Sequence, residues 1–358
     1  MIKSKVITAS GGKREAHAII TVDDPTLTFG RQLEEILTQY DEVKTALGSG
    51  MRPVFRRWFL SDSANQRALV SDDGECATSI VEQPPLSLTK AALWVWMIED
   101  AEVEKCDDGR FAVKAFGHTH LFEGGVRRPG MDTCQAIYSM LKATDRALQD
   151  SGGSLLESCA RTWIFVQNVD ADYADVVKGR NRAFEELGLT PETRFIASTG
   201  IGGRQEDPSV SVAMDSYSVL GLMKGAMRQI SAPSHLNPTH EYGVAFERAA
   251  SICYADRRHL FISGTASIDN KGRIVAPGDI RRQTLRMWEN VETLLKAASF
   301  GWKDVGHILV YLRDPADCAV VKEMFENRFP DIPYIILLAP VCRPGWLVEM
   351  ECMAMRGI

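Results

Sequence analysis

The sequence predicts an α+β protein with a duplicated unit, and three observations support this prediction. Two segments of the chain carry the same order of a helix, a strand and a second helix. Their strands align residue by residue, so that Ile164 matches Ile308 and Asp170 matches Asp314. A third stretch, residues 54–126, contains short β-rich runs between Gly, Asp and Pro clusters. Repeats of this kind indicate tandem structural units.

The N-terminal stretch has the weaker pattern. We expect a strand over residues 18–22 and a helix over residues 33–40, and we assign no chemistry to residues 1–50. Asp107-Asp108-Gly109 predicts a hairpin turn, because Asp tolerates and Gly favours positive φ. The further strands expected here cover residues 55–60, 91–97, 111–116 and 118–122.

The repeat itself is a β-α-β-α-β unit. In the first copy, apolar side chains recur at helical spacing from Ile137 to Leu148, and Ser151-Gly152-Gly153 ends that helix. The alignment also places residues 176–178 against residues 320–322. The Pro- and Gly-containing stretch 221–237 is the expected boundary, which gives domains 1–235 and 236–358. The other elements expected are a strand over 164–170 and a helix from 171 in the first copy, and a helix over 284–298, a strand over 308–314 and a helix over 316–329 in the second.

Composition excludes several classes of function. With 358 residues, 45% of them hydrophobic and 25% charged, the chain is long enough for two cores. Its net charge of −6 argues against a nucleic-acid-binding surface. The eight cysteines are spread without a CxxC pair, which favours reduced thiols in a cytoplasmic protein. We expect no signal peptide, and no run approaches the ~20 apolar residues of a membrane span.

The C-terminal residues 246–356 carry an ordered set of motifs. These are the run from Leu260 to Ser267, Pro277-Gly278-Asp279 with Gln283, the run from Val310 to Asp314, and the closing strand from Leu347 to Ala354. In these motifs the segment resembles the Rid (YjgF) family. The resemblance implies a mixed sheet backed by two helices, usually assembled as a homotrimer with ligand sites between sheets. Rid imine deaminases place a carboxylate-binding arginine two residues after the proline that matches Pro333, whereas this chain has Ile335.

A second resemblance reaches from Gln83 to the end of the chain. It is carried by Gln83-Pro84-Pro85-Leu86, Arg161-Thr162-Trp163, Gly179-Arg180 and the run from Ser198 to Gly202. In these features the chain resembles chorismatases, which hydrolyse the enolpyruvyl ether of chorismate and look like two fused Rid-type halves. Cys342 lies seven residues before Glu349, where that family places a pocket residue and its acidic catalyst. The chain departs from the family where Ile268-Asp269-Asn270-Lys271-Gly272 replaces a Gly-His pair.

The closing strand brings two carboxylates together. Because side chains alternate along a strand, Glu349 and Glu351 point to the same face. Two carboxylates about 7 Å apart discourage simultaneous ionisation, so one pKa should rise. A carboxyl that is protonated at neutral pH suits a general acid, and we predict that Glu349 has this role. The alternative is that both glutamates face solvent or pair with Arg343 and Arg356.

Other residues are candidates for binding a carboxylate substrate. Arg313 shares a strand face with Tyr311, and its planar fork suits a carboxylate, although Asp314 or Asp317 could pair with it instead. Arg180 could hold a second carboxylate of a diacid, or it could be a solvated helix residue. The remaining candidates are the backbone at Gly264, Thr265, Cys342 as a pocket wall, and Glu351.

The predicted function is therefore the removal of an enolpyruvyl group from chorismate or a related cyclic carboxylate, by hydrolysis or elimination. Water and an acid suffice for this reaction, so no cofactor is expected. His118 and His120 share a strand face but have no third ligand at useful spacing, so no metal is expected. The expected partner is a small-molecule carboxylate substrate, with no nucleic acid and no membrane. The alternatives are another Rid-type imine or enamine hydrolase and a non-catalytic metabolite-binding protein.

Overall fold

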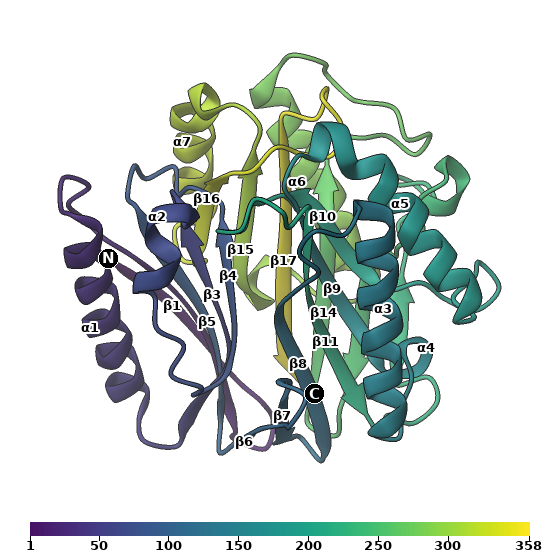
Figure 1. The fold of residues 1–358 in the computed structure, drawn as a ribbon, viewed down its shortest axis with the longest axis horizontal. Helices are drawn as coiled ribbons and strands as arrows, with labels where there is room; N and C mark the ends of the chain where they lie inside the picture. The colour runs from purple at the N-terminus through teal and green to yellow at the C-terminus, as the bar shows by residue number, and fades with distance from the viewer.

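The computed structural model describes the backbone of residues 1–358 and every side chain except that of Tyr242. The chain forms three mixed β-sheets, so the α+β class predicted from the sequence is confirmed. Figure 1 shows helices α1 and α3 at opposite sides of the molecule, with the strands of the sheets between them. No helix among the described residues combines the length and the apolar character needed to cross a membrane.

The first unit, residues 2–99, contains a five-stranded sheet with the order β1-β2-β5-β3-β4. Strands β3 and β4 are parallel, and the other neighbours are antiparallel. The elements are β1 (Ile2–Thr8), β2 (Arg14–Thr21), α1 (Phe29–Leu47), β3 (Met51–Leu60), α2 (Ser63–Gln66), η1 (Arg67–Leu69), β4 (Ala77–Glu82) and β5 (Ala91–Glu99).

The middle unit, residues 102–220, contains a six-stranded sheet with the order β10-β9-β11-β8-β7-β6. The predicted turn at Asp107-Asp108-Gly109 joins β6 to β7, and Gly109 has a φ of +87°. The elements are β6 (Glu102–Lys105), β7 (Phe111–Ala115), β8 (His118–Arg127), α3 (Thr133–Asp150), α4 (Leu155–Ser158), β9 (Cys159–Val166), α5 (Val169–Glu186), β10 (Ala197–Gly202) and β11 (Val212–Leu220).

The C-terminal unit, residues 227–357, contains a six-stranded sheet with the order β12-β13-β14-β17-β15-β16. Its parallel pair, β15 and β16, corresponds to β9 and β10 of the middle unit and to β3 and β4 of the first. The elements are β12 (Met227–Ile230), η2 (Thr239–Tyr242), β13 (Ala249–Cys253), β14 (Arg257–Ala266), α6 (Ile280–Ala297), η3 (Trp302–Asp304), β15 (Val305–Leu312), η4 (Pro315–Asp317), α7 (Cys318–Arg328), β16 (Tyr334–Leu338) and β17 (Val348–Gly357).

The two predicted copies of the repeat are thus the middle and C-terminal units, and the first unit is a third version of the same strand order. It was not recognised in the sequence because its second helix has shrunk to the four-residue α2. Strand β12, which lies inside the expected boundary segment, pairs with β13 and so belongs to the C-terminal sheet. The division into domains 1–235 and 236–358 stays a prediction.

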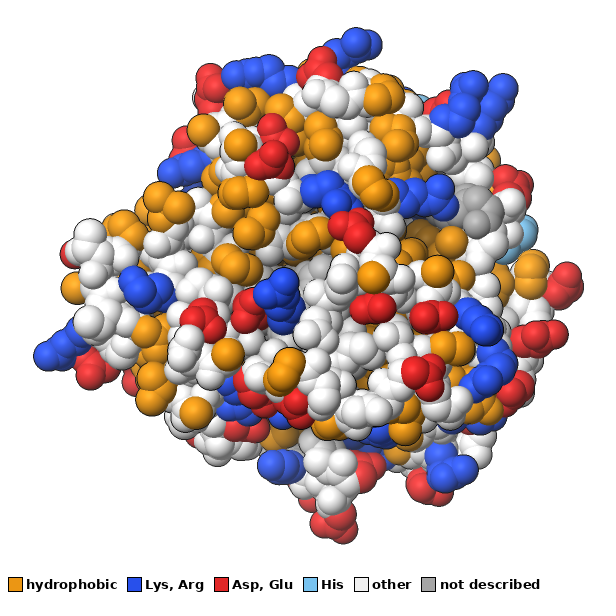
Figure 2. All heavy atoms as spheres, turned by 45° about the horizontal axis from the view of Figure 1, so that its top comes forward, with side chains coloured by type: hydrophobic (Ala, Val, Ile, Leu, Met, Phe, Trp, Pro, Cys, Tyr) orange, Lys and Arg blue, Asp and Glu red, His pale blue; other side chains and the backbone are white. Residues whose placement is uncertain are grey.

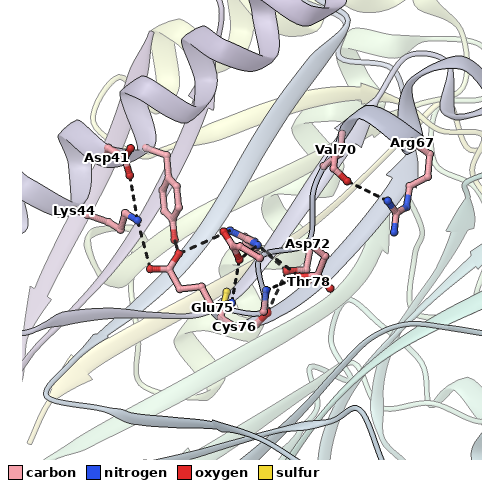
Figure 3. A network of polar contacts seen from close by, with 12 residues as sticks. Asp41, Lys44, Arg67, Val70, Asp72, Glu75, Cys76 and Thr78 are labelled. Carbon is pink, nitrogen blue, oxygen red and sulfur yellow. Dashed lines mark hydrogen bonds and ion pairs between the residues drawn. The ribbon is translucent and has the colours of Figure 1, made fainter.

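A polar network replaces the missing helix of the first unit (Figure 3). The Arg56 guanidinium is buried on β3 and forms an ion pair with Asp73, from the loop that precedes β4. Glu75 of the same loop accepts hydrogen bonds from Tyr40 Oη at 2.9 Å and from Lys44 Nζ at 3.4 Å, both on α1. These contacts hold the loop against the sheet where the other units have a long helix.

The apolar faces of the three sheets share one core. Trp96 of β5 lies 6.2 Å from Phe261 of β14, and Phe261 lies 5.2 Å from Tyr217 of β11, measured between ring centroids. One buried ion pair also crosses each interface between two units. These pairs are Arg57 with Asp215 at 2.7 Å, Arg161 with Glu351 at 2.7 Å, and Arg257 with Glu15 at 2.6 Å.

Candidate active site

A cleft lies between the middle and C-terminal units. Helix α5 and strand β10 form its middle-unit side, and β14, β17 and the loop before β17 form the other. The cleft lies beside the close approach of β10 to β14. It is therefore a site between two sheets, as the resemblance to the Rid family implied.

Glu349 lies on the wall of this cleft and its residue is only 4% exposed. Burial, together with the nearby charge of Glu351, raises the pKa of Glu349 to about 8, although Arg248 and Arg161 act in the opposite direction. No hydrogen bond to its carboxylate is found among the described side chains. The carboxyl therefore carries a proton at neutral pH, which is the state that a general acid needs.

Glu351 shares the strand face of Glu349 but has a different environment. Its Oε2 accepts a hydrogen bond from Arg161 Nη2 at 2.7 Å, and its Oε1 accepts one from Trp163 Nε1 at 2.7 Å. Glu351 lines a smaller cavity next to the cleft rather than the cleft itself. It can thus influence Glu349 through its charge without reaching a ligand in the cleft.

Arg180 on α5 also lines the cleft, and only 1% of it is exposed. Its Nε and Nη2 have no hydrogen-bond partner among the described residues. The Nε1 of Trp346, another lining residue, is likewise buried without a partner. A buried donor without an acceptor lowers the stability of the protein, because it loses its hydrogen bond to water. This wall of the cleft is therefore suited to a ligand that has several acceptor oxygens.

Helix α5 positions Arg180 through two features of its sequence. Asn168 caps the helix, because its side chain accepts a hydrogen bond from the backbone of Ala171. Gly179 allows α5 to lie against α3, since a Cβ at that position would be 2.2 Å from the carbonyl oxygen of Cys134. Tyr173 and Arg180 are separated by two helical turns and so point into the cleft together.

The apolar part of the lining faces these charged groups. Val244, Phe246, Ile268 and Trp346 supply surfaces for a ring or a hydrocarbon. Two further arginines lie among them. The Arg248 guanidinium donates to the carbonyl oxygen of Asn237, and that of Arg343 lies 5.2 Å from the Trp346 ring centroid; both lining arginines have further interactions within the protein.

Cys342 lines the cleft, as the resemblance to chorismatases implied. Burial and the charge of Glu349 raise the pKa of its thiol to about 12. Burial and the proximity of Cys342 also raise the pKa of Tyr173 well above its ordinary value. Both raised pKa values favour the protonated groups at neutral pH, and a protonated thiol is a poor nucleophile.

Gly264 meets Glu349 directly. A Cβ on Gly264 would be 2.2 Å from Glu349 Oε1, so a larger residue would displace the carboxyl group. The Gly264 backbone N–H donates to Thr199 Oγ1 at 2.8 Å. Gly264 therefore joins β14 to β10 and leaves space for the carboxyl group of Glu349.

Three other predicted residues lie outside the cleft. Arg313 forms an ion pair with Asp170 and donates to the carbonyl oxygen of Val341 at 2.7 Å, in a separate depression at the ends of the strands. The hydroxyl of Thr265 donates to the carbonyl oxygen of Ser263 at 2.9 Å. Tyr311 is fully buried on β15, where it pairs with Glu349 of β17.

Sequence reasoning missed Arg248, Phe246 and Tyr173 as parts of the cleft. Arg248 and Phe246 lie in the loop before β13, where no local pattern distinguishes them from other loop residues. Tyr173 lies seven residues before Arg180, so helical spacing was the available signal. Among the residues whose side chains are described, no group of three His, Cys, Asp or Glu residues is placed to hold a metal ion.

Comparison with known proteins places this site in a family. A model of the family described as endoribonuclease L-PSP matches residues 247–356. A 3-hydroxybenzoate synthase of Streptomyces hygroscopicus is 28% identical over 289 residues, which cover 73% of this chain and 81% of that protein. A crystal structure of a chorismatase superposes with a TM-score of 0.69 and 21% identity, over 98% of this chain and 99% of the other.

A shorter relative shows the family directly. A RutC family protein of Pyrococcus horikoshii is 33% identical over 99 residues, which cover 27% of this chain and 79% of that protein. The family model matches the C-terminal unit, which supplies Glu349, Gly264 and Cys342 to the cleft. The chain therefore belongs to the Rid (YjgF) superfamily, and its fold is that of the chorismatases.

Proposed function

We propose that the protein is a chorismatase-like enzyme that removes the enolpyruvyl group from chorismate or a related cyclic carboxylate, with Glu349 as the general acid. One observation carries the proposal. A carboxyl group that keeps its proton at neutral pH lies in the same cleft as an arginine with unpartnered donors. An enolpyruvyl ether needs both groups, because it is protonated at carbon and it carries a carboxylate.

In the proposed reaction, Glu349 transfers its proton to the methylene carbon of the enol ether. The carbon that bears the ether oxygen becomes an oxocarbenium ion and is attacked by water. The resulting hemiketal breaks its bond to the ring oxygen, which takes a proton, and pyruvate leaves. The sum is one ether and one water giving one ring alcohol and one pyruvate. The carboxylate of Glu349 regains a proton in this sum.

Substrate binding is assigned to the donors opposite Glu349. The guanidinium of Arg180 would pair with a carboxylate of the substrate, and its burial strengthens that bond. Trp346 Nε1 can donate to a second oxygen, while Phe246 and Ile268 pack against the ring. Cys342 and Tyr173 limit the space on the remaining side.

The similarity to chorismatases and to a 3-hydroxybenzoate synthase suggests two options for the ring product. Hydrolysis leaves a ring diol, whereas elimination of pyruvate without net water leaves a hydroxybenzoate. The similarity to a 3-hydroxybenzoate synthase supports the second option. Chromatography of the ring product against both standards distinguishes them.

An imine or enamine substrate is the second enzyme hypothesis. In this chain Ile335 replaces the arginine of Rid imine deaminases, and it lies in a different cleft, between β16 and the first unit. An isoleucine there offers no charge-assisted bond to a carboxylate. We therefore propose negligible turnover of 2-iminobutyrate, measured beside an active Rid deaminase.

The experiment that tests the function is incubation with chorismate, with released pyruvate coupled to lactate dehydrogenase. Arg180→Met should lower kcat/KM by roughly 10- to 100-fold, because a charge-assisted hydrogen bond is lost. Arg182→Met is the matched control, since Arg182 lies on the same helix but is exposed and stacked on Tyr138. Binding of chorismate without pyruvate release would favour the non-catalytic metabolite-binding hypothesis.

The cytoplasm is the proposed compartment. All eight cysteines are free thiols, and three of them are buried. Reduced thiols of this kind are typical of a reducing compartment.

The resemblance to single-unit Rid proteins implies a homotrimer, in which an uncovered apolar sheet face is buried against neighbouring subunits. In this chain the three sheets already cover one another, so this argument for a homotrimer does not apply.

A further inference from the structure

We propose that Arg161 and Trp163 of the middle unit determine which of the paired carboxyls holds the proton, by keeping Glu351 ionised so that the proton stays on Glu349. The inference deepens the proposed function, since it explains how Glu349 remains an acid. Arg161 and Trp163 are positioning residues, because they line the small cavity next to the cleft rather than the cleft.

The geometry distinguishes the two carboxyls. Both oxygens of Glu351 accept N–H hydrogen bonds at 2.7 Å, one from a guanidinium and one from an indole. Neither donor can accept a proton in return, because an indole N–H and a guanidinium are donors only. Glu349, one strand period away on the same face, has no such donor among the described residues.

Burial then forces a choice between the carboxyls. Glu349 and Glu351 are 4% and 3% exposed, so ionising both would place two like charges in a region of low dielectric, and only Glu351 has a bonded guanidinium to offset its charge. Hydrogen bonds to the charged form stabilise the carboxylate of Glu351. The remaining proton therefore belongs to Glu349, where the desolvation cost of a charge is not offset by a bonded donor.

Other titratable and charged groups face this pair from several elements. Arg248 before β13 faces Glu349, while Tyr311 of β15 is near both glutamates. Tyr173 of α5, together with Cys342 before β17, faces Glu349 from the cleft. The tyrosines and the cysteine are uncharged at neutral pH because burial raises their pKa values.

Of the groups that are hydrogen-bonded to the two glutamates, only Arg161 carries a positive charge. The remaining charged groups in the cleft lining are Arg180 and Arg343, and Cys352 lies beside Glu351.

The two donors are themselves held in place. Arg161 Nη2 also donates to Thr199 Oγ1, and the Arg161 guanidinium lies 4.9 Å from the Trp163 ring centroid. Trp163 stacks on Phe55 of the first unit, with ring centroids 5.9 Å apart. The donors therefore cannot turn toward Glu349 without breaking contacts in two units. Two residues of the middle unit thus determine which glutamate of the C-terminal unit holds the proton.

Infrared difference spectroscopy of the full-length protein tests this inference without any substrate. At neutral pH, Glu349→Gln should remove a carboxylic-acid C=O band that Glu351→Gln retains. Subtraction against wild type is needed, because Glu123 is another buried carboxyl whose pKa is raised by burial. The opposite pattern, with the band lost in Glu351→Gln alone, would overturn the proposal.

The roles of the donors are measured in the Glu349→Gln background, where Glu351 is the remaining member of the pair. At a fixed pH the acid band of Glu351 should become stronger when Trp163→Phe is added, because one hydrogen bond to the carboxylate is lost. Arg161→Gln should strengthen the band further, since the counter-charge is also lost. Trp58→Phe is the matched control, as the buried Nε1 of Trp58 has no partner among the described residues.

If the pH dependence of the acid band were the same with and without Trp163→Phe, the inference would be contradicted, even if Arg161→Gln failed to fold. A purely structural role for Trp163 would lower stability but leave this pH dependence unchanged. Failure of the proposed function would look different: no pyruvate would be released from chorismate, and the infrared result would stand. The two proposals therefore fail independently.

Discussion

Gly264 is the residue whose replacement most directly displaces the carboxyl group of Glu349, the proposed general acid. A methyl group there would lie 2.2 Å from Glu349 Oε1 and 3.0 Å from Thr199 Cγ2. We predict that Gly264→Ala lowers kcat about 100-fold, the usual effect of moving a reacting group by about 1 Å. Gly30→Ala is the control, because nothing lies within 4 Å of its added Cβ. A Gly264→Ala enzyme with normal kcat would show that the carboxyl has other room.

The protonated state of Glu349 also affects stability. Its pKa is about 8 in the folded protein, against 4.5 for an ordinary glutamate, because burial opposes the charge. Between these values the folded state holds a proton that the unfolded state has released, so the free energy of unfolding falls as pH rises through this window. Relative to Glu349→Gln, wild type should lose roughly 3–5 kcal/mol from pH 4.5 to 8. Denaturant titrations at several pH values measure the difference, and parallel pH curves would contradict it.

At the scale of elements, α5 is the helix that the cleft depends on. Gly179 packs against α3, where a Cβ would lie 2.2 Å from the carbonyl oxygen of Cys134 and 2.6 Å from Ile137 Cγ2. Ala in place of Gly usually stabilises a helix interior by ~1 kcal/mol. We predict the opposite sign for Gly179→Ala, a loss of a few kcal/mol from overpacking. Thermal unfolding measures it, and an increase in Tm would show that α5 and α3 separate freely.

The elements also show what the sequence could and could not predict. The stripes around Ile137 and Trp288 are local periodic signals, and α3 and α6 were found from them. The strand that was expected over 164–170 runs from Cys159 to Val166, because the segment after it caps α5 instead. The burial of Arg180 depends on the packing of α5 across a unit boundary, and no local pattern reports such packing.

The same distinction holds within the candidate site. Strand alternation alone predicted that Glu349 and Glu351 share a face, because side-chain period is a local property. Their different partners, however, come from Arg161 and Trp163, some 190 residues earlier in the chain. In the sequence, the segment from Arg161 to Trp163 carries only a resemblance to chorismatases. Its physical role required the three-dimensional structure.

At the scale of the whole molecule, three units with the same strand order surround one core, and each interface contains a buried ion pair. Figure 2 shows acidic and basic side chains interspersed on the visible face, with no continuous field of one sign. The three sheets of this one chain bury apolar side chains in a shared core. The sequence-based reason for a homotrimer, an uncovered apolar sheet face, is therefore absent.

We predict that the protein is a monomer in solution. Light scattering at micromolar concentrations should give the mass of one chain, 39.7 kDa. A mass three times larger, stable on dilution, would restore the homotrimer and require an interface on the outer surface.

The buried ion pair between the first and middle units gives a separate prediction for stability. Arg57→Met leaves the buried Asp215 without its charged partner and should lower the free energy of unfolding by about 3–5 kcal/mol.

The most direct test of the central claim compares wild type and Glu349→Gln for pyruvate release from chorismate. Glutamine keeps the shape of the side chain but cannot deliver a proton, so turnover should fall by roughly 10²- to 10⁴-fold while the fold is kept. Wild-type activity should also decline above about pH 8, where Glu349 ionises. A folded Glu349→Gln enzyme with near-normal turnover, or a wild type that releases no pyruvate, would contradict the account.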